Sequence, residues 1–180
     1  MTHVHRHALV RQTPQQMFDL VNDVEAYPAR FAWCANAKVL ERDDTHVVAR
    51  LDLRFAGVVR HFVTRNAIER PSRIAMQFVE GPFRSLSGEW TFHTLGGKAP
   101  SSGSAGHPGS SPGQALLPQA GQGETEQPAA TNTSAGCKVE LTLDFEVANW
   151  LTGVALRVGF QKLADQMVDD FVAESNKSCA

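Results

Sequence analysis

The chain has 180 residues, of which 42% are hydrophobic and 20% are charged, a balance typical of one globular domain with an apolar core. Its formal net charge of −2 at pH 7 excludes a global attraction to nucleic acid, so DNA is not an expected partner and only a local basic patch stays open. Three widely spaced cysteines argue against a disulfide framework or a zinc site, and the lack of a signal-peptide core or of about 18 consecutive apolar residues predicts a cytoplasmic protein without a membrane span.

The N-terminal region is predicted to form a strand and then a helix. His3, His5 and His7 alternate along the strand. His-x-His spacing can bind a metal ion, but no acidic or cysteine partner is evident nearby, so we interpret the row as a solvated strand face and expect no metal. In the helix that follows, Thr13 is the predicted cap and Pro14 the first residue, while Tyr27-Pro28 is predicted to end it.

Alternating apolar and polar residues dominate the centre and the end of the chain. The clearest cases are residues 47–55 and 139–147, and residues 74–78 and 86–92 repeat the pattern. Such alternation indicates strands with one buried and one solvated face, which is typical of an antiparallel sheet. We expect a meander of about six strands between the first helix and the C-terminal segment.

Residues 96–136 differ sharply from the rest of the chain. They hold nine of the fourteen glycines and five of the nine prolines, and no aromatic residue. Such a segment cannot bury enough apolar surface to offset the entropy of ordering it. Because strands are predicted on both sides, we interpret it as a disordered low-complexity insertion within a single domain that spans residues 1–180.

The C-terminal segment, from about Asn149 to Ala173, is predicted to be a long amphipathic helix. Its apolar stripe recurs at helical spacing and comprises Leu156, Phe160, Leu163, Met167 and Phe171. Strands followed by a segregated helix favour an α+β fold, with the helix on one face of the antiparallel sheet. A sheet that curves around one helix can enclose an apolar ligand cavity.

Five segments together resemble the coenzyme-Q-binding START-domain family, part of the polyketide cyclase/dehydrase-like (SRPBCC) superfamily. They are Met17–Pro28, Trp33-Cys34, Phe62–Asn66, Gly81–Leu86 and Leu143–Glu146. The resemblance runs from about residue 3 to residue 173 apart from the insertion, and it implies a helix-grip fold, a curved antiparallel sheet wrapped around the long C-terminal helix. The run from Leu20 to Pro28 is most similar to the bacterial ribosome-association toxins of this family.

The resemblance implies two functions on one fold. Our first expectation is non-catalytic binding of a hydrophobic isoprenoid ligand, ubiquinone above all, in support of cellular respiration, with peripheral contact at the inner membrane as a further option. The alternative is a toxin that binds the large ribosomal subunit, blocks its association with the small subunit and so inhibits translation. A cyclase-like enzyme is a weaker alternative. Because no Ser-His-Asp arrangement, metal set or phosphate-binding glycine loop can be placed, we expect no enzyme and no cofactor beyond the bound ubiquinone.

The candidate site residues fall into two sets. The residues predicted to line a ligand cavity are Phe18, Trp33, Phe55, Phe62, Phe78, Phe83, Trp90, Phe92, Phe145, Leu156, Phe160, Leu163 and Met167. For each of them, plain core packing is the competing interpretation. A candidate basic patch for RNA phosphates or anionic lipid head groups comprises Arg50, Arg54, Arg60 and Arg65. Its competing interpretation is an ordinary solvated sheet face.

Overall fold

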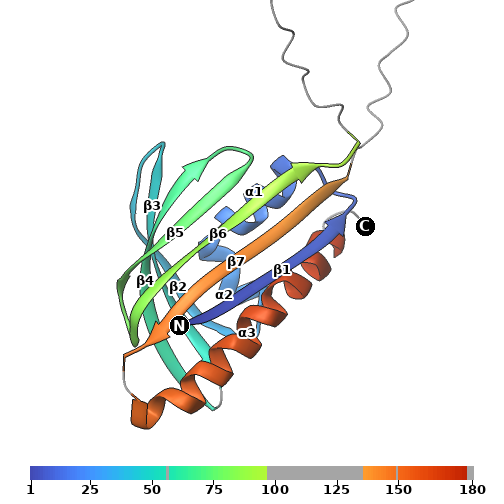
Figure 1. The fold of residues 1–180 in the computed structure, drawn as a ribbon. Helices are drawn as coiled ribbons and strands as arrows, with labels where there is room; N and C mark the ends of the chain where they lie inside the picture. The colour runs from blue at the N-terminus through green and yellow to red at the C-terminus, as the bar shows by residue number, and fades with distance from the viewer. Residues whose placement is uncertain (56, 97–135, 149, 178–180) are drawn as a thin grey trace, which may run out of the picture.

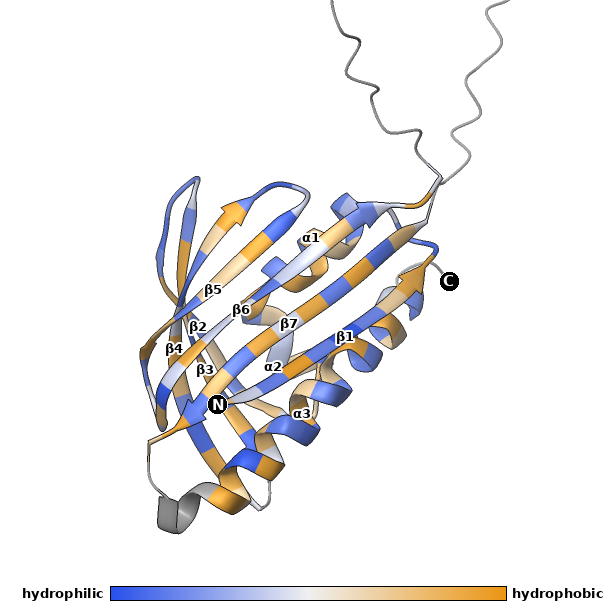
Figure 2. Cartoon of the chain, viewed as in Figure 1, coloured by the Kyte–Doolittle hydropathy of each residue, from blue (hydrophilic) through white to orange (hydrophobic). Residues whose placement is uncertain are grey.

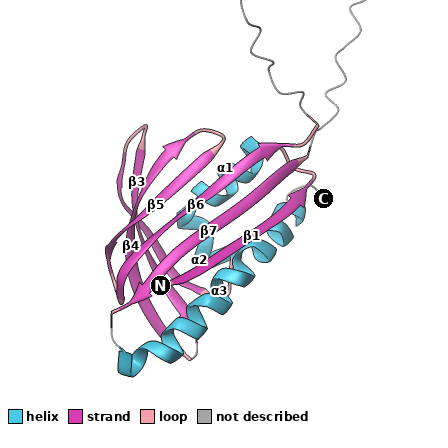
Figure 3. Cartoon of the chain, viewed as in Figure 1, coloured by secondary structure: helices cyan, strands magenta, loops and turns pink. Residues whose placement is uncertain are grey.

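The computed structural model describes residues 1–55, 57–96, 136–148 and 150–177. Its elements are, in chain order, β1 (Thr2–Val10), α1 (Pro14–Asn22), η1 (Val24–Ala26), α2 (Tyr27–Arg30), β2 (Cys34–Arg42), β3 (His46–Phe55), β4 (Val58–Glu69), β5 (Arg73–Glu80), β6 (Phe83–Thr94), β7 (Cys137–Val147) and α3 (Trp150–Lys177). The strands form one curved antiparallel sheet, and α3 packs along one face of it beside β1 and β7 (Figures 1 and 3). This arrangement confirms the predicted α+β helix-grip fold.

The strand order is β1-β7-β6-β5-β4-β3-β2. Strands β2 to β6 follow one another as a meander, and β7 then pairs with both β6 and β1. In the β1–β7 pair, Thr2 lies opposite Phe145 and Val10 opposite Cys137. Strand β1 therefore joins the sheet through its pairing with β7, and β1 and β2 form the two edges.

The buried face of the sheet is the face that the alternating pattern predicts. Along β7, buried residues from Cys137 to Phe145 alternate with partly exposed ones, and Figure 2 shows the corresponding alternation of apolar and polar bands. The buried side chains pack against the apolar residues of α3, of which Phe160, Phe171 and Ala164 are at most 2% exposed. The core thus lies between the sheet and the long helix.

The predicted cap of the first helix is confirmed. The side chain of Thr13 accepts a hydrogen bond from the Gln16 amide at 3.2 Å, and the Gln16 side chain accepts one from the Thr13 amide at 2.8 Å. The predicted end of this helix is wrong. The structure ends α1 at Asn22, and Tyr27-Pro28 begins the short helix α2 instead. Proline fits there because the first helical turn needs no amide hydrogen from it.

Strands β6 and β7 bring the two ends of the predicted insertion next to each other. Thr94 lies opposite Cys137, and the Leu95 amide donates a hydrogen bond to the Gly136 carbonyl at 2.7 Å. Of the segment predicted to be an insertion, residues 97–135 lie outside the described part of the chain. Because the two ends meet in one hairpin, the sheet on both sides is continuous.

The histidine row of β1 lies beside acidic residues that were not expected there. His3 Nδ1 is 2.8 Å from an Asp144 oxygen, and His5 Nε2 is 3.5 Å from a Glu140 oxygen. The carboxylates come from β7, which the register places next to β1 although the two strands are far apart in sequence. Among the described residues, no three histidine, cysteine or acidic side chains are grouped so as to hold a metal ion, and no helix there is long and apolar enough to cross a membrane.

Candidate functional site

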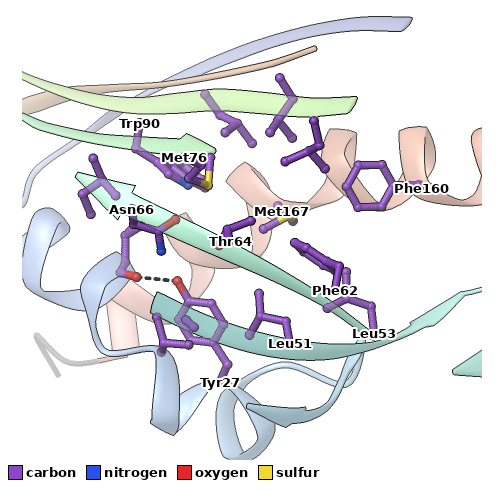
Figure 4. Close-up of a pocket in the computed structure, with 17 residues that line it drawn as sticks. Tyr27, Leu51, Leu53, Phe62, Thr64, Asn66, Met76, Trp90, Phe160 and Met167 are labelled. Atoms are coloured by element: carbon purple, nitrogen blue, oxygen red, sulfur yellow. Dashed lines mark hydrogen bonds between the residues drawn. The ribbon is translucent and has the colours of Figure 1, made fainter. Parts of the chain in front are cut away.

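A small cavity of about 60 Å³ lies between the sheet and α3 (Figure 4). Its walls come from the buried faces of strands β3 to β7, from α1 and α2, and from α3. The lining residues are Val21, Val24, Tyr27, Ala49, Leu51, Leu53, Phe62, Thr64, Asn66, Ile74, Met76, Leu86, Trp90, Leu141, Leu143, Phe160 and Met167. Most of this surface is apolar because the inward positions of the strands carry the hydrophobic half of the alternating pattern.

One end of the cavity is polar. Thr64 and Asn66 are 4% and 8% exposed and follow Phe62 at alternate positions of β4, so all three face inward. The Oδ1 atom of Asn66 is buried and has no hydrogen-bond partner in the described structure. Figure 4 places Asn66 and Tyr27 at one end of the site, with Phe62 and Phe160 toward the other. A ligand group that donates a hydrogen bond would satisfy the Asn66 oxygen.

Tyr27 is fixed beside this polar end. Its hydroxyl donates a hydrogen bond to the Val21 carbonyl, and its ring packs against Phe31, Trp33 and Phe171. Burial, the largest influence, raises the pKa of the phenol, so the group stays protonated. Its hydroxyl hydrogen is already used in this bond, whereas the buried Oδ1 of Asn66 has no partner in the described structure.

Four of the residues predicted to line a cavity do so: Phe62, Trp90, Phe160 and Met167. The side chain of Phe55 lies outside the described part of the structure. The others pack elsewhere and do not line this cavity, namely Phe18, Trp33, Phe78, Phe83, Phe92, Phe145, Leu156 and Leu163. Most of these aromatic rings contact one another instead. Phe145, for example, lies 4.8 Å from Phe160 and 5.9 Å from Phe83, centre to centre.

The cavity predicted from the sequence was apolar, and Thr64 and Asn66 were not among its predicted lining residues. The structure places both of these polar residues in the wall of the cavity. The signal that could have found them is their spacing, because residues two and four positions after Phe62 share its face in a strand. The segment Phe62–Asn66, one of the five that carry the family resemblance, contains this pattern.

A second concavity opens at the surface between α3 and the edge of β3. This groove, which we call the α3–β3 groove, has a volume of about 460 Å³. It is lined by Trp33, Arg54, Ala155, Val158, Gly159, Lys162, Leu163 and Gln166. On the β2 side, the strand pairing of β3 ends at Leu53, opposite Cys34, and beyond it the Arg54 amide donates a hydrogen bond to the Trp33 carbonyl at 2.7 Å. On its other side, β3 stays paired with β4 to its end.

The four arginines of the predicted basic patch do not share one face. Register places Arg50 and Arg54 on the outer side of β3, and Arg65 lies opposite Val48 on the same side. Arg60 lies opposite the buried Leu53 and therefore points to the other side of the sheet. Arg50 is also paired with a carboxylate, since its Nε is 3.0 Å from an Asp52 oxygen. The expected patch of four is thus a group of three, and one of them is partly neutralised.

The described cysteines offer no reactive nucleophile. Cys34 and Cys137 are 2% and 0% exposed and form no disulfide. Burial raises the pKa of both thiols from about 9 to about 11. Both are therefore thiols, not thiolates, at neutral pH, and they act as small apolar core residues.

The chain is similar in sequence to a known family and to several named proteins. Residues 10–172 match the family described as polyketide cyclase/dehydrase and lipid transport. A protein of Vibrio cholerae named ribosome association toxin RatA is 32% identical over 177 residues, which cover 98% of this chain and 97% of that protein. A protein of Pseudomonas aeruginosa with the same name is 31% identical over 170 residues, covering 94% and 92% of the two chains.

Solved structures show the same fold at lower sequence identity. The Zhui aromatase/cyclase from a Streptomyces species superposes with a TM-score of 0.69 at 17% identity and covers 99% of this chain and 96% of its own. A START superfamily protein from Mycobacterium smegmatis gives a TM-score of 0.66 at 14% identity, with 97% of each chain covered. At these identities the likeness concerns the fold alone.

Proposed function

The chain belongs to the polyketide cyclase/dehydrase and lipid transport family, and from this premise we propose that it is a ribosome-association factor that binds the large subunit and hinders its joining with the small one. The observation that carries the proposal is identity of about 30% over nearly the whole length of proteins named ribosome association toxin RatA. The likeness covers both the sheet and α3 and extends across almost all of each relative. It therefore supports a shared activity of the whole domain.

The interior cavity is too small for ubiquinone in the conformation that the structure describes. Small-molecule sites span roughly 300–1,000 Å³, whereas this cavity has about 60 Å³. That space holds a few water molecules but not a quinone ring with an isoprenoid tail. Carriage of ubiquinone, our first expectation from the sequence, thus stays a prediction with weaker support than the alternative.

The function is tested by sedimentation of the purified protein with isolated ribosomal subunits. We expect it to sediment with large subunits and to lower the fraction of joined ribosomes when both subunits are present. Small subunits are the control, because their RNA has the same phosphate chemistry and would reveal general attraction to nucleic acid. Equal binding to both subunits, or protein that stays unbound with both, would contradict the proposal.

A second candidate function rests on the unpaired oxygen of Asn66 at the polar end of the cavity. We propose binding of a hydrophobic molecule with one hydroxyl or other hydrogen-bond donor, which requires the cavity to widen by movement of α3. Lipid extraction and mass spectrometry should then detect a bound molecule whose retention falls about three- to tenfold in Asn66→Ala, the effect of one lost hydrogen bond. Asn36→Ala, at an exposed position of β2, is the control. Wild-type protein free of lipid would rule this function out.

A further inference from the structure

The α3–β3 groove carries two positive charges that the fold does not neutralise. Arg54 comes from the end of β3 and Lys162 from the middle of α3, and both are exposed. No ion pair is found for either residue within the described part of the chain, whereas most other described arginines pair with carboxylates. None of the residues that line the groove is acidic. The acidic side chain in contact with the lining residues is Asp170, which accepts hydrogen bonds from Trp33 at 2.9 Å and Gln166 at 3.3 Å and makes no ion pair with Arg54 or Lys162 in the described part of the chain.

The wall between these cations is apolar and partly aromatic. Val158 is 57% exposed although it is a large aliphatic residue, and Trp33 and Leu163 form the deeper part of the wall. The Trp33 indole is held firmly, since its Nε1 donates to Asp170 at 2.9 Å and its ring stacks on Phe31 at 5.0 Å.

The space in front of this wall comes from two small residues of α3. The groove-lining residues of α3 include Ala155, whose side chain is one methyl group, and Gly159, which has no side chain, so neither fills the space. The resulting 460 Å³ falls within the range of roughly 300–1,000 Å³ that accommodates small ligands.

We propose that the α3–β3 groove binds an unpaired segment of ribosomal RNA, with phosphates at Arg54 and Lys162 and a base or ribose against the apolar wall. The inference rests on the proposed function and names the surface that performs it. Cations that follow a backbone beside an apolar or aromatic wall are the common design of single-strand binding sites. Because Val154 and Val158 of α3 are 62% and 57% exposed, the test below also includes a membrane surface, and its outcome distinguishes that surface from RNA.

The outer face of the sheet extends the positive surface from Arg54. Lys38 lies directly opposite Arg50 across β2 and β3, and Arg65 lies one strand further on. Like charges opposite one another weaken a sheet, and Asp52 offsets only the Arg50 charge. Fold stability alone therefore does not account for this pair, whereas contact with successive phosphates does.

The test compares two double variants with the same change in net charge. Arg54→Glu with Lys162→Glu alters the groove, and Arg11→Glu with Arg42→Glu is the matched control at exposed positions outside it. The probes are purified large subunits, measured by sedimentation, and a labelled oligouridine, measured by fluorescence anisotropy across a salt series. The groove variant should bind both probes about tenfold more weakly or worse. The slope of its binding constant against salt concentration should fall by roughly one to two ions released, because two phosphate contacts are lost. The affinity of the control variant should stay within about twofold of the wild type.

A second variant, Arg54→Gln with Lys162→Gln, removes the charges without reversing them and covers the event that the reversal impairs folding. Circular dichroism melting verifies that each variant is folded. Wild-type protein that fails to sediment with large subunits would overturn the proposed function itself. Wild-type protein that sediments, together with groove variants that bind as well as the control, would overturn the groove alone. Groove variants that lose binding to phosphatidylglycerol vesicles but still bind the oligouridine and the large subunit would overturn the RNA assignment in favour of a membrane.

Discussion

Trp90→Ala is expected to lower the free energy of unfolding by about 3–5 kcal/mol, the usual effect of removing a fully buried aromatic side chain. Trp90 is 2% exposed, stacks on Phe92 and meets the edge of Phe171 at 5.2 Å between ring centres. Because it also lines the interior cavity, its removal would enlarge an existing void instead of creating a separate one. A urea titration monitored by circular dichroism measures the change.

The control for Trp90 is Val59→Ala, since Val59 is 48% exposed and should change stability by less than about 0.5 kcal/mol. A loss below about 1 kcal/mol for Trp90→Ala would mean that the aromatic contacts around Phe171 contribute little to the fold.

Gly81→Ala is expected to lower the free energy of unfolding by roughly 2–4 kcal/mol. Gly81 joins β5 to β6 with φ at +143°, a conformation that other residues rarely adopt. An added Cβ would lie 2.7 Å from the Cβ of Phe62 and 3.0 Å from its Cα, so β4 would have to shift. Thermal and urea unfolding of the variant give the change in stability.

Gly57→Ala separates the effect of the backbone conformation from the effect of the steric clash. Gly57 also has positive φ, at +76°, but an added Cβ there would meet nothing within 4 Å. Its substitution should therefore lose only the conformational part, about 1 kcal/mol. Equal losses in the free energy of unfolding for Gly81→Ala and Gly57→Ala would show that the clash with Phe62 adds no destabilisation.

The sequence predicted the elements with strong local signals. Residues 47–55 and 139–147 alternate cleanly because each strand has one face against α3 and one in water, and they became β3 and β7. Strand β2 gave a weaker signal, since it is an edge strand with Leu40 exposed. The C-terminal helix extends to Lys177, beyond the predicted end at about residue 173, because the apolar stripe marks only the part that contacts the sheet.

The candidate site was harder to predict than the fold. Hydrophobic pattern indicates that Phe62 and Phe145 face inward, but it cannot tell that Phe62 borders a void while Phe145 packs among other rings, because voids depend on how side chains fit together. The four arginines of the predicted basic patch do not share one face, for a reason that the sequence did contain. Arg60 and Arg65 are an odd number of positions apart in one strand, which puts them on opposite faces.

The position of β1 bears on how the protein is made. Since Thr2 pairs with Phe145, β1 leaves the ribosome during translation well before β7, the strand with which it pairs. At about 5–20 residues per second, that interval is on the order of ten seconds. Non-local pairing of this kind also slows folding itself. The sheet is completed only after β7 has been synthesised, and α3, which covers it, follows β7 in the chain.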